Sequence, residues 1–374
     1  MLDHCPLSTR QGSQPAQADC RDLRFDFAKG MLIILVIIGH LIQYVIYGDG
    51  DYWYSPYFKA IYMFHMPLFM AISGYLSSGA LLRKSLARSV GERVMQLLVP
   101  ALFWCMFMET AKFAAFKFAG ASPSDNLTGG LPDFVNDLIG SYWFIWAAFA
   151  SFLAMKLLLA VCGRVSTWII CISAILVALV PVTSSIVPLV RYTYPFFCLG
   201  FLFAQPSEWR ARIISRHRPL LMFSLVAISC ACFLSWSKET YVYINLVLVH
   251  DAASAKQVLL MLLGSAAASA VVMESVLKFW SFCGANRLVR LIAVELGQST
   301  LLLYLVQGTA FRLMDLIPLG EPWDFSIRVA VAGTLAVGIV VIATTIRRIV
   351  RDIGWISRIV LGAPPRSLSS TINN

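Results

Sequence analysis

The sequence predicts an all-α protein, a polytopic transmembrane helical bundle of about ten spans with both termini cytoplasmic. Of its 374 residues, 59% are hydrophobic and only 13% are charged, and the mean hydropathy is +0.74. This composition is far from that of a soluble domain and typical of a multi-pass membrane protein. Apolar runs near the length that crosses a bilayer recur along the chain. They are 31–47, 57–78, 94–118, 141–162, 167–182, 187–205, 219–236, 256–277, 296–316 and 326–346.

Three parts are predicted along the chain. Residues 1–23 are polar and predict a disordered cytoplasmic tail, residues 24–350 form one transmembrane domain, and residues 351–374 form a cytoplasmic C-terminal tail. Most of the 30 lysines and arginines fall on the side of the first tail when the spans alternate. The positive-inside rule therefore places both ends in the cytoplasm. The net charge of +10 indicates orientation in a lipid bilayer, and we expect no nucleic acid partner.

Common catalytic and metal-binding patterns do not occur in the chain. We find no Walker, Rossmann, GxSxG or HExxH motif. The nine cysteines lie mainly in apolar runs, without a CxxC pair or a histidine at metal-ligand spacing. We expect these cysteines to be small buried residues, and we expect no metal site.

The first span combines an apolar run with polar residues on one face. His40 lies well inside it, and an ionisable side chain in hydrocarbon is costly enough to suggest a function. Lys29 precedes His40 by eleven residues, so both lie on one helix face, roughly 16 Å apart along the axis. Asp26 and Gln43 fall near the same stripe. We therefore predict a polar track that enters the membrane along this helix.

A second histidine, His65, lies in the second span. By helical rise, His40 and His65 are both roughly 10–12 Å below the outer surface. Pro67 has no N–H to donate, so it leaves the carbonyl of Met63 without its helical partner and predicts a kink there. The shared depth favours one site that contains both histidines.

The inner loop after the second span carries Arg83, Arg88 and Arg93 at spacings that give a helix one basic edge. One interpretation is an anchor on anionic lipid. The other is a docking surface for a phosphorylated cytosolic donor, and the loop alone does not decide between them.

Three more residues are candidates for substrate binding. Trp143 belongs to an aromatic cluster that fits either an interfacial belt or the face of a sugar ring. Arg191 lies near the outer edge of its span, against the general charge bias. Tyr304 shares a face of the ninth span with Gln307.

The stretch FDFAKGMLIILVIIGH resembles the first-helix signature of the membrane acyltransferase family 3, in which ten residues separate a basic residue from a histidine, here Lys29 and His40. The resemblance continues through FHMPLFMAISGYL, the basic loop before LLVP, YWFIWAAF, YPFFCLGFLF and LGQSTLLLYLVQG, over most of residues 24–310. The chain is most similar to the fucose 4-O-acetylase type, which modifies bacterial and notably rhizobial nodulation glycans. Gln307 departs from the pattern, because such proteins often carry a histidine there.

The resemblance implies a multi-pass enzyme of the bacterial inner membrane. It would move an acetyl group from cytosolic acetyl-CoA to a hydroxyl of a glycan or lipid-linked sugar, with acetyl-CoA as a substrate and no permanently bound cofactor. A neutral imidazole can take the hydroxyl proton near neutral pH, so His40 is the expected base, or an acyl-carrying nucleophile. The other expected roles are donor binding by Lys29, Arg83, Arg88 and Arg93, orientation of Lys29 by Asp26, placement of the acceptor hydroxyl or oxyanion by His65, and acceptor contacts from Gln43, Trp143, Arg191 and Tyr304.

Two alternatives stay open. Transfer of succinyl or another short acyl group would use the same residues. A transporter or flippase for a lipid-linked sugar could use the histidines as proton relays, but inverted repeats and paired broken helices, which would support it, are not evident in the sequence. The oligomeric state is not indicated.

Overall fold

The structure is a computed structural model that describes residues 22–47, 51–118, 130–163, 165–182, 186–242, 252–314 and 323–363. This part of the chain is helical and contains no strand. Its α-helices are α1 Leu23–Leu41, α2 Pro56–Tyr62, α3 His65–Arg83, α4 Leu86–Arg93, α5 Val99–Phe118, α6 Gly130–Ser141, α7 Trp143–Cys162, α8 Thr167–Ala178, α9 Val187–Ala204, α10 Glu208–Ser235, α11 Ala252–Cys283, α12 Arg287–Leu291, α13 Thr300–Met314, α14 Phe325–Val350 and α15 Gly354–Leu361.

The helical membrane bundle predicted from the sequence is confirmed. Within the described ranges, nine helical segments are long and apolar enough to cross a membrane. The predicted span 167–182 contains α8, an apolar helix of 12 residues that is shorter than these nine. The side of the membrane on which each terminus lies stays a prediction.

The two predicted tails are only partly described. Residues 1–21 and 364–374 lie outside the described residues. Within the predicted C-terminal tail, α15 packs on α5, where the indole Nε1 of Trp104 donates to the carbonyl of Val360 at 3.2 Å. The domain limits of the sequence analysis stay predictions.

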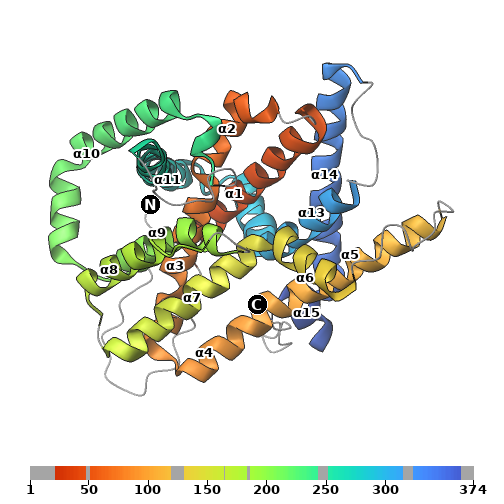
Figure 1. Cartoon of the computed structure of the whole chain (residues 1–374), viewed down its shortest axis with the longest axis horizontal. Helices are drawn as coiled ribbons and strands as arrows, with labels where there is room; N and C mark the ends of the chain where they lie inside the picture. Colours follow the sequence, from red (N-terminus) through yellow and green to blue (C-terminus); the bar gives the residue numbers. More distant parts are fainter. Residues whose placement is uncertain are drawn as a thin grey trace.

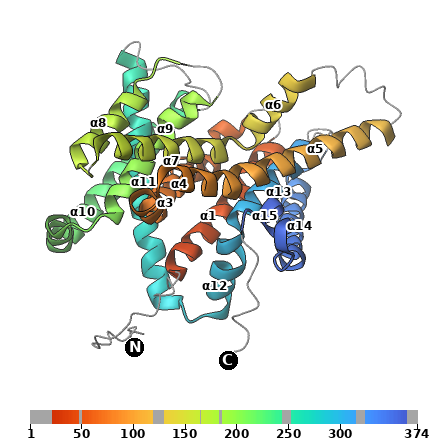
Figure 2. The ribbon, with the colours of Figure 1, turned by 90° about the horizontal axis from the view of Figure 1, so that it is seen from below.

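Helix α1 lies in the interior of the bundle (Figures 1 and 2). It contacts α2, α3, α11, α13 and α14. Ala28, Leu32 and Val36 are almost fully buried, since neighbouring helices cover α1 on several sides. Asp26 of the predicted polar face is also buried among these neighbours.

Glycines allow the closest approaches between helices. A Cβ at Gly74 of α3 would lie 2.1 Å from the carbonyl oxygen of Phe197, and one at Gly200 of α9 would lie 1.8 Å from that of Ala71. A Cβ at Gly297 would meet the carbonyl oxygen of Asp26 at 1.9 Å. Small residues at such contacts let helix backbones pack directly in a membrane bundle.

The second predicted span is broken where Pro67 predicts a kink. Helix α2 ends at Tyr62, and α3 starts at His65. The residue at the break, Met63, has the carbonyl that Pro67 cannot use. The break places His65 at the first turn of α3, and the kink prediction is confirmed.

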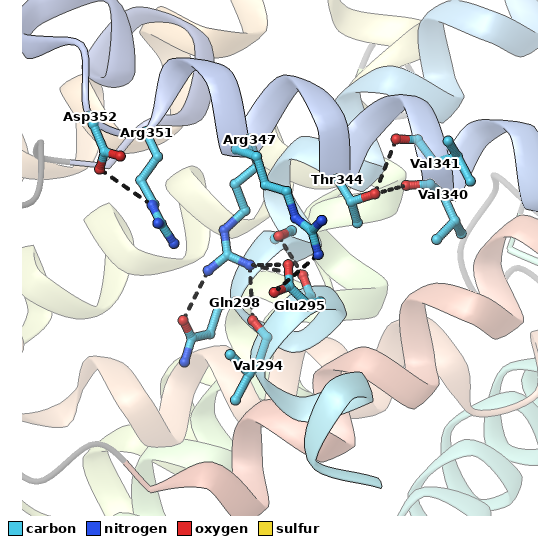
Figure 3. Close-up of polar contacts among 11 residues, drawn as sticks. Val294, Glu295, Gln298, Val340, Val341, Thr344, Arg347, Arg351 and Asp352 are labelled. Atoms are coloured by element: carbon cyan, nitrogen blue, oxygen red, sulfur yellow. Dashed lines mark hydrogen bonds and ion pairs between the residues drawn. The ribbon is translucent and has the colours of Figure 1, made fainter. Parts of the chain in front are cut away.

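Three π-helical segments were not predicted: η1 Ile42–Tyr47, η3 Val94–Leu98 and η6 Ile292–Leu296. Segment η6, with the 3-10 turn η7 Gly297–Ser299 that follows it, packs on α1. Figure 3 shows that Arg347 of α14 reaches this segment, where its guanidinium donates to the carbonyls of Val294 and Glu295 at 2.9 and 3.1 Å. The cation thus adds hydrogen bonds to carbonyls at the end of this wider turn.

Candidate active site

Two cavities meet next to α1. One cavity, of about 240 Å³, is lined by His40 and His65, and the other, of about 150 Å³, by Lys29 and Arg93. We call them the outer and the inner cavity, after the predicted topology. Met66 and Tyr304 line both cavities. The predicted polar track therefore opens into two chambers, with Met66 and Tyr304 between them.

His40 lies in the last turn of α1 and faces the outer cavity among aromatic rings. The ring centroid of Phe311 is 5.3 Å from that of His40, and Phe311 stacks on Tyr44 at 5.5 Å. The Nδ1 atom of His40 is buried and has no hydrogen-bond partner within the described part of the chain. Packing and a side-chain hydrogen bond with Gln43 thus hold the imidazole, while Nδ1 stays available for a ligand.

His65 is oriented by the backbone. Its Nδ1 lies 2.8 Å from the carbonyl of Ile61, one turn back across the break between α2 and α3. A carbonyl can only accept, so Nδ1 carries the hydrogen, and in the neutral ring Nε2 carries the lone pair. Neutral His65 can therefore accept a hydrogen bond from a substrate hydroxyl. Stabilising an oxyanion would require the protonated ring.

The inner cavity has cationic groups and an apolar wall. The Nζ of Lys29 forms an ion pair with Asp26 at 2.8 Å, and the Asp26 side chain is only 3% exposed. Arg93 donates to the hydroxyl of Ser77 at 2.8 Å, and its guanidinium lies 4.9 Å from the ring centroid of Phe152. These contacts fix both cations at the wall of one cavity, where they suit phosphate groups.

The other basic residues of the predicted donor site lie elsewhere. Arg83 is exposed and lines neither cavity. Arg88 is 72% exposed and forms an ion pair with Glu92 at 3.1 Å. Glu92 also pairs with Lys84, so this basic loop is partly neutralised on its own surface.

Three of the four residues predicted to contact the acceptor line the outer cavity, and the fourth does not. Gln43, Trp143 and Tyr304 line the outer cavity. The Tyr304 hydroxyl accepts a hydrogen bond from the backbone N–H of Phe144 at 3.3 Å. Its own hydrogen can therefore be donated to a bound ligand. Arg191 lines neither cavity; it is buried in α9 and donates to the carbonyl of Val180 at 2.5 Å, beyond the end of α8.

Arg312 is a residue of the outer cavity that the sequence analysis missed. Its Nε donates to the hydroxyl of Ser141 at 3.0 Å. A signal was available, because Arg312 lies eight residues after Tyr304 on the same face of the ninth predicted span. The described residues contain no cluster of three or more potential metal ligands.

Comparison with known proteins gives a family match and two close relatives. Residues 22–346 match the family model described as "Acyltransferase domain". The chain is 60% identical to "Nodulation protein NolL" of Sinorhizobium fredii (strain NBRC 101917 / NGR234), over 95% of this chain and 96% of the relative. It is 57% identical to "Nodulation protein NolL" of Mesorhizobium japonicum (strain LMG 29417 / CECT 9101 / MAFF 303099), over 98% and 97%. No solved structure is significantly similar to the chain.

Proposed function

Since this chain belongs to the acyltransferase family and is a multi-pass membrane protein, we propose that it is an O-acetyltransferase of the bacterial inner membrane. It moves an acetyl group from cytosolic acetyl-CoA to a sugar hydroxyl of a bacterial glycan or lipo-oligosaccharide, and we favour fucose as that sugar. The relatives are named as nodulation proteins of two rhizobia, which supports a nodulation glycan as acceptor.

The observation that carries the proposal is the meeting of the two cavities at Met66 and Tyr304. In the proposal, the inner cavity takes the donor, with its phosphates at Lys29 and Arg93 and its thioester toward the junction. The outer cavity takes the acceptor, over aromatic rings that suit the face of a sugar. Lys29 and His40 are eleven residues apart on α1, about 16 Å along the helix, so one rigid element sets the distance between phosphates and base.

The proposed reaction is a single acyl transfer. His40 takes the proton of the acceptor hydroxyl, whose oxygen forms a bond to the thioester carbonyl carbon. The oxyanion that develops receives a hydrogen bond from the Tyr304 hydroxyl, which lines both cavities. The C–S bond then breaks, and the thiolate of CoA takes the proton from His40. His65 accepts a hydrogen bond from the acceptor sugar and orients it.

The lining of the inner cavity supports acetyl over succinyl. Between the cations and the junction, the wall is built largely from aromatic and aliphatic side chains, among them Phe69, Phe144 and Phe197. The free carboxylate of a succinyl group would lose its hydration there, which is costly without a paired cation. A neutral short acyl group meets no such penalty.

Transfer of radiolabel from acetyl-CoA tests the proposed function. Membranes that contain the wild type or His40→Ala are incubated with labelled acetyl-CoA and octyl α-L-fucopyranoside, and base-labile label on the sugar is measured. We expect the wild type to label the fucoside and His40→Ala to lose at least roughly 100-fold in rate, in the range found for general base catalysis.

The matched control is His217→Ala. His217 is exposed in α10 and lines neither cavity, so its replacement should leave the rate unchanged. Retained transfer by His40→Ala would remove His40 from the chemistry. Absence of label with the wild type would reject the fucoside as acceptor.

A further inference from the structure

Gln307 has a buried side chain that the fold does not satisfy. Its residue is only 1% exposed, in the middle of α13. Its Oε1 is buried and accepts no hydrogen bond from any residue that the structure describes. Leaving a buried acceptor without a hydrogen bond costs about 1–3 kcal/mol of stability. We therefore expect this amide oxygen to accept a hydrogen bond from a group outside the described residues.

The residue that carries this oxygen, Gln307, lines the outer cavity. The same cavity contains His40, whose Nδ1 is also buried and unpaired within the described ranges. Two residues that each carry a buried, unsatisfied polar atom thus line a chamber of about 240 Å³, and its other walls include stacked aromatic rings. A carbonyl oxygen can only accept, so the ligand must bring a donor to Gln307.

We infer that Gln307 selects the acceptor. Its Oε1 accepts a hydrogen bond from a second hydroxyl of the sugar ring, while a first hydroxyl of that ring gives its proton to His40. This inference rests on the proposed function and adds the substrate class: the acceptor carries a free hydroxyl besides the one that is acylated. A site built to bind a hydroxyl rejects an analogue that lacks it, because the buried oxygen is then left unpaired.

Monodeoxy acceptors test this role. The kcat/KM for acetyl transfer is measured with octyl α-L-fucopyranoside and its 2-, 3- and 4-deoxy analogues, for the wild type, Gln307→Met and Gln307→Ala. The analogue without the acylated hydroxyl gives no product with any form. Of the other two, we expect one to be at least roughly tenfold poorer than the parent with the wild type, the value of a lost hydrogen bond. With both variants, that analogue and the parent should react within about threefold of each other.

The ratio between two acceptors is the readout, because it does not depend on how much folded protein each membrane contains. Gln298→Met is the matched control. Gln298 lies in the same candidate span, but its Oε1 already accepts a hydrogen bond from Arg347 at 3.0 Å (Figure 3). This control should keep the wild-type ratio.

Three outcomes are decisive. If the Gln307 variants reject the deoxy analogue as strongly as the wild type does, the role of Gln307 is wrong. The same conclusion follows if the wild type treats both remaining analogues like the parent. If the wild type acetylates no fucoside at all, the proposed acceptor fails first, before any variant is compared, and the inference falls with it.

Discussion

Lys29 is the residue on which donor binding depends most in our proposal. It lines the inner cavity, and Asp26 holds its ammonium group at 2.8 Å from a carboxylate oxygen. The pair occupies the first turns of α1, whose later turns carry His40. Replacing Lys29 should therefore change the binding of acetyl-CoA more than the chemical step.

We predict that Lys29→Ala raises the KM for acetyl-CoA by roughly 10- to 100-fold, since a hydrogen bond to a charged group contributes about 1.5–3 kcal/mol. The kcat should change much less. Arg88→Ala is the comparison, because Arg88 is exposed and paired with Glu92, and its loss should change KM by less than about threefold, as is usual for surface ion pairs. Initial rates over a range of acetyl-CoA concentrations measure both. If the two variants raised the KM for acetyl-CoA equally, the assignment of donor binding to Lys29 in the cavity and not to Arg88 on the surface would be wrong.

Sequence reasoning identified some residues of the cavities and not others. His40, Lys29 and Gln43 could be predicted because they share one helix, where spacing alone fixes the face. Arg93 and Arg88 could not be told apart, since only the packing of α4 and η3 on α7 decides which arginine is half-buried and which is exposed. The unpaired state of Gln307 depends on neighbours from distant parts of the chain and is visible only in the structure.

At the scale of elements, the position of α1 depends on its contact with η7. Gly297 lies against the carbonyl of Asp26, and Gly30 lies against the carbonyl of Ile292, where an added Cβ would be at 2.7 Å. At the end of α1 that carries Lys29, each of the two glycines thus lies against the backbone of the opposite helical segment. Any side chain at Gly297 must move α1 or η7, and Asp26 and Lys29 move with them.

We predict that Gly297→Ala lowers the free energy of unfolding by about 1–3 kcal/mol, the usual cost of overpacking. It should also raise the KM for acetyl-CoA, because the Asp26–Lys29 pair is displaced. Thermal stability in detergent and donor kinetics measure these effects. The control is Gly338→Ala in α14, where an added Cβ would meet no atom within 4 Å. That variant should be neutral or slightly more stable, by up to about 1 kcal/mol, because alanine favours helix.

Most helices could be predicted from the sequence, but their irregular turns could not. Long apolar runs and Pro67 gave the spans and the break before His65. The π-helical segment η6 has no such signal, because its wider turn depends on the glycine contact with α1 and on Arg347, which is more than fifty residues away. Tertiary contacts of this kind leave no local pattern.

At the scale of the whole molecule, both ends of the described bundle lie on one side. Arg347, near the end of α14, contacts η6 (Figure 3). The adjoining Gly297 lies against the backbone of Asp26 in the first turn of α1. Helix α13 runs from Thr300 at the inner cavity to Phe311 at the outer one, parallel to the path from Lys29 to His40. The chain must therefore cross the membrane an even number of times between these two ends.

Within the described ranges the nine long segments give an odd number, so we take the segment of α8 to complete the count. Alone, α8 is about 18 Å long, shorter than the roughly 30 Å of hydrocarbon. Beyond the end of α8, the guanidinium of Arg191 donates a hydrogen bond to the carbonyl of Val180. In the hydrocarbon of a membrane this carbonyl would otherwise be left unpaired. We therefore interpret residues 167–182 as a short crossing that α9 lines on one side.

We predict that both termini are cytoplasmic, because the positive-inside rule assigns the side that carries most lysines and arginines to the cytoplasm. Epitope tags at each end of the full chain should be cut by protease in inside-out vesicles and not in spheroplasts. A tag inserted within 119–129, between α5 and α6, should show the opposite pattern. If only the C-terminal tag is cut in spheroplasts, residues 167–182 do not cross. If both terminal tags are cut there, the bundle is inverted, and Lys29 could not meet a cytosolic donor.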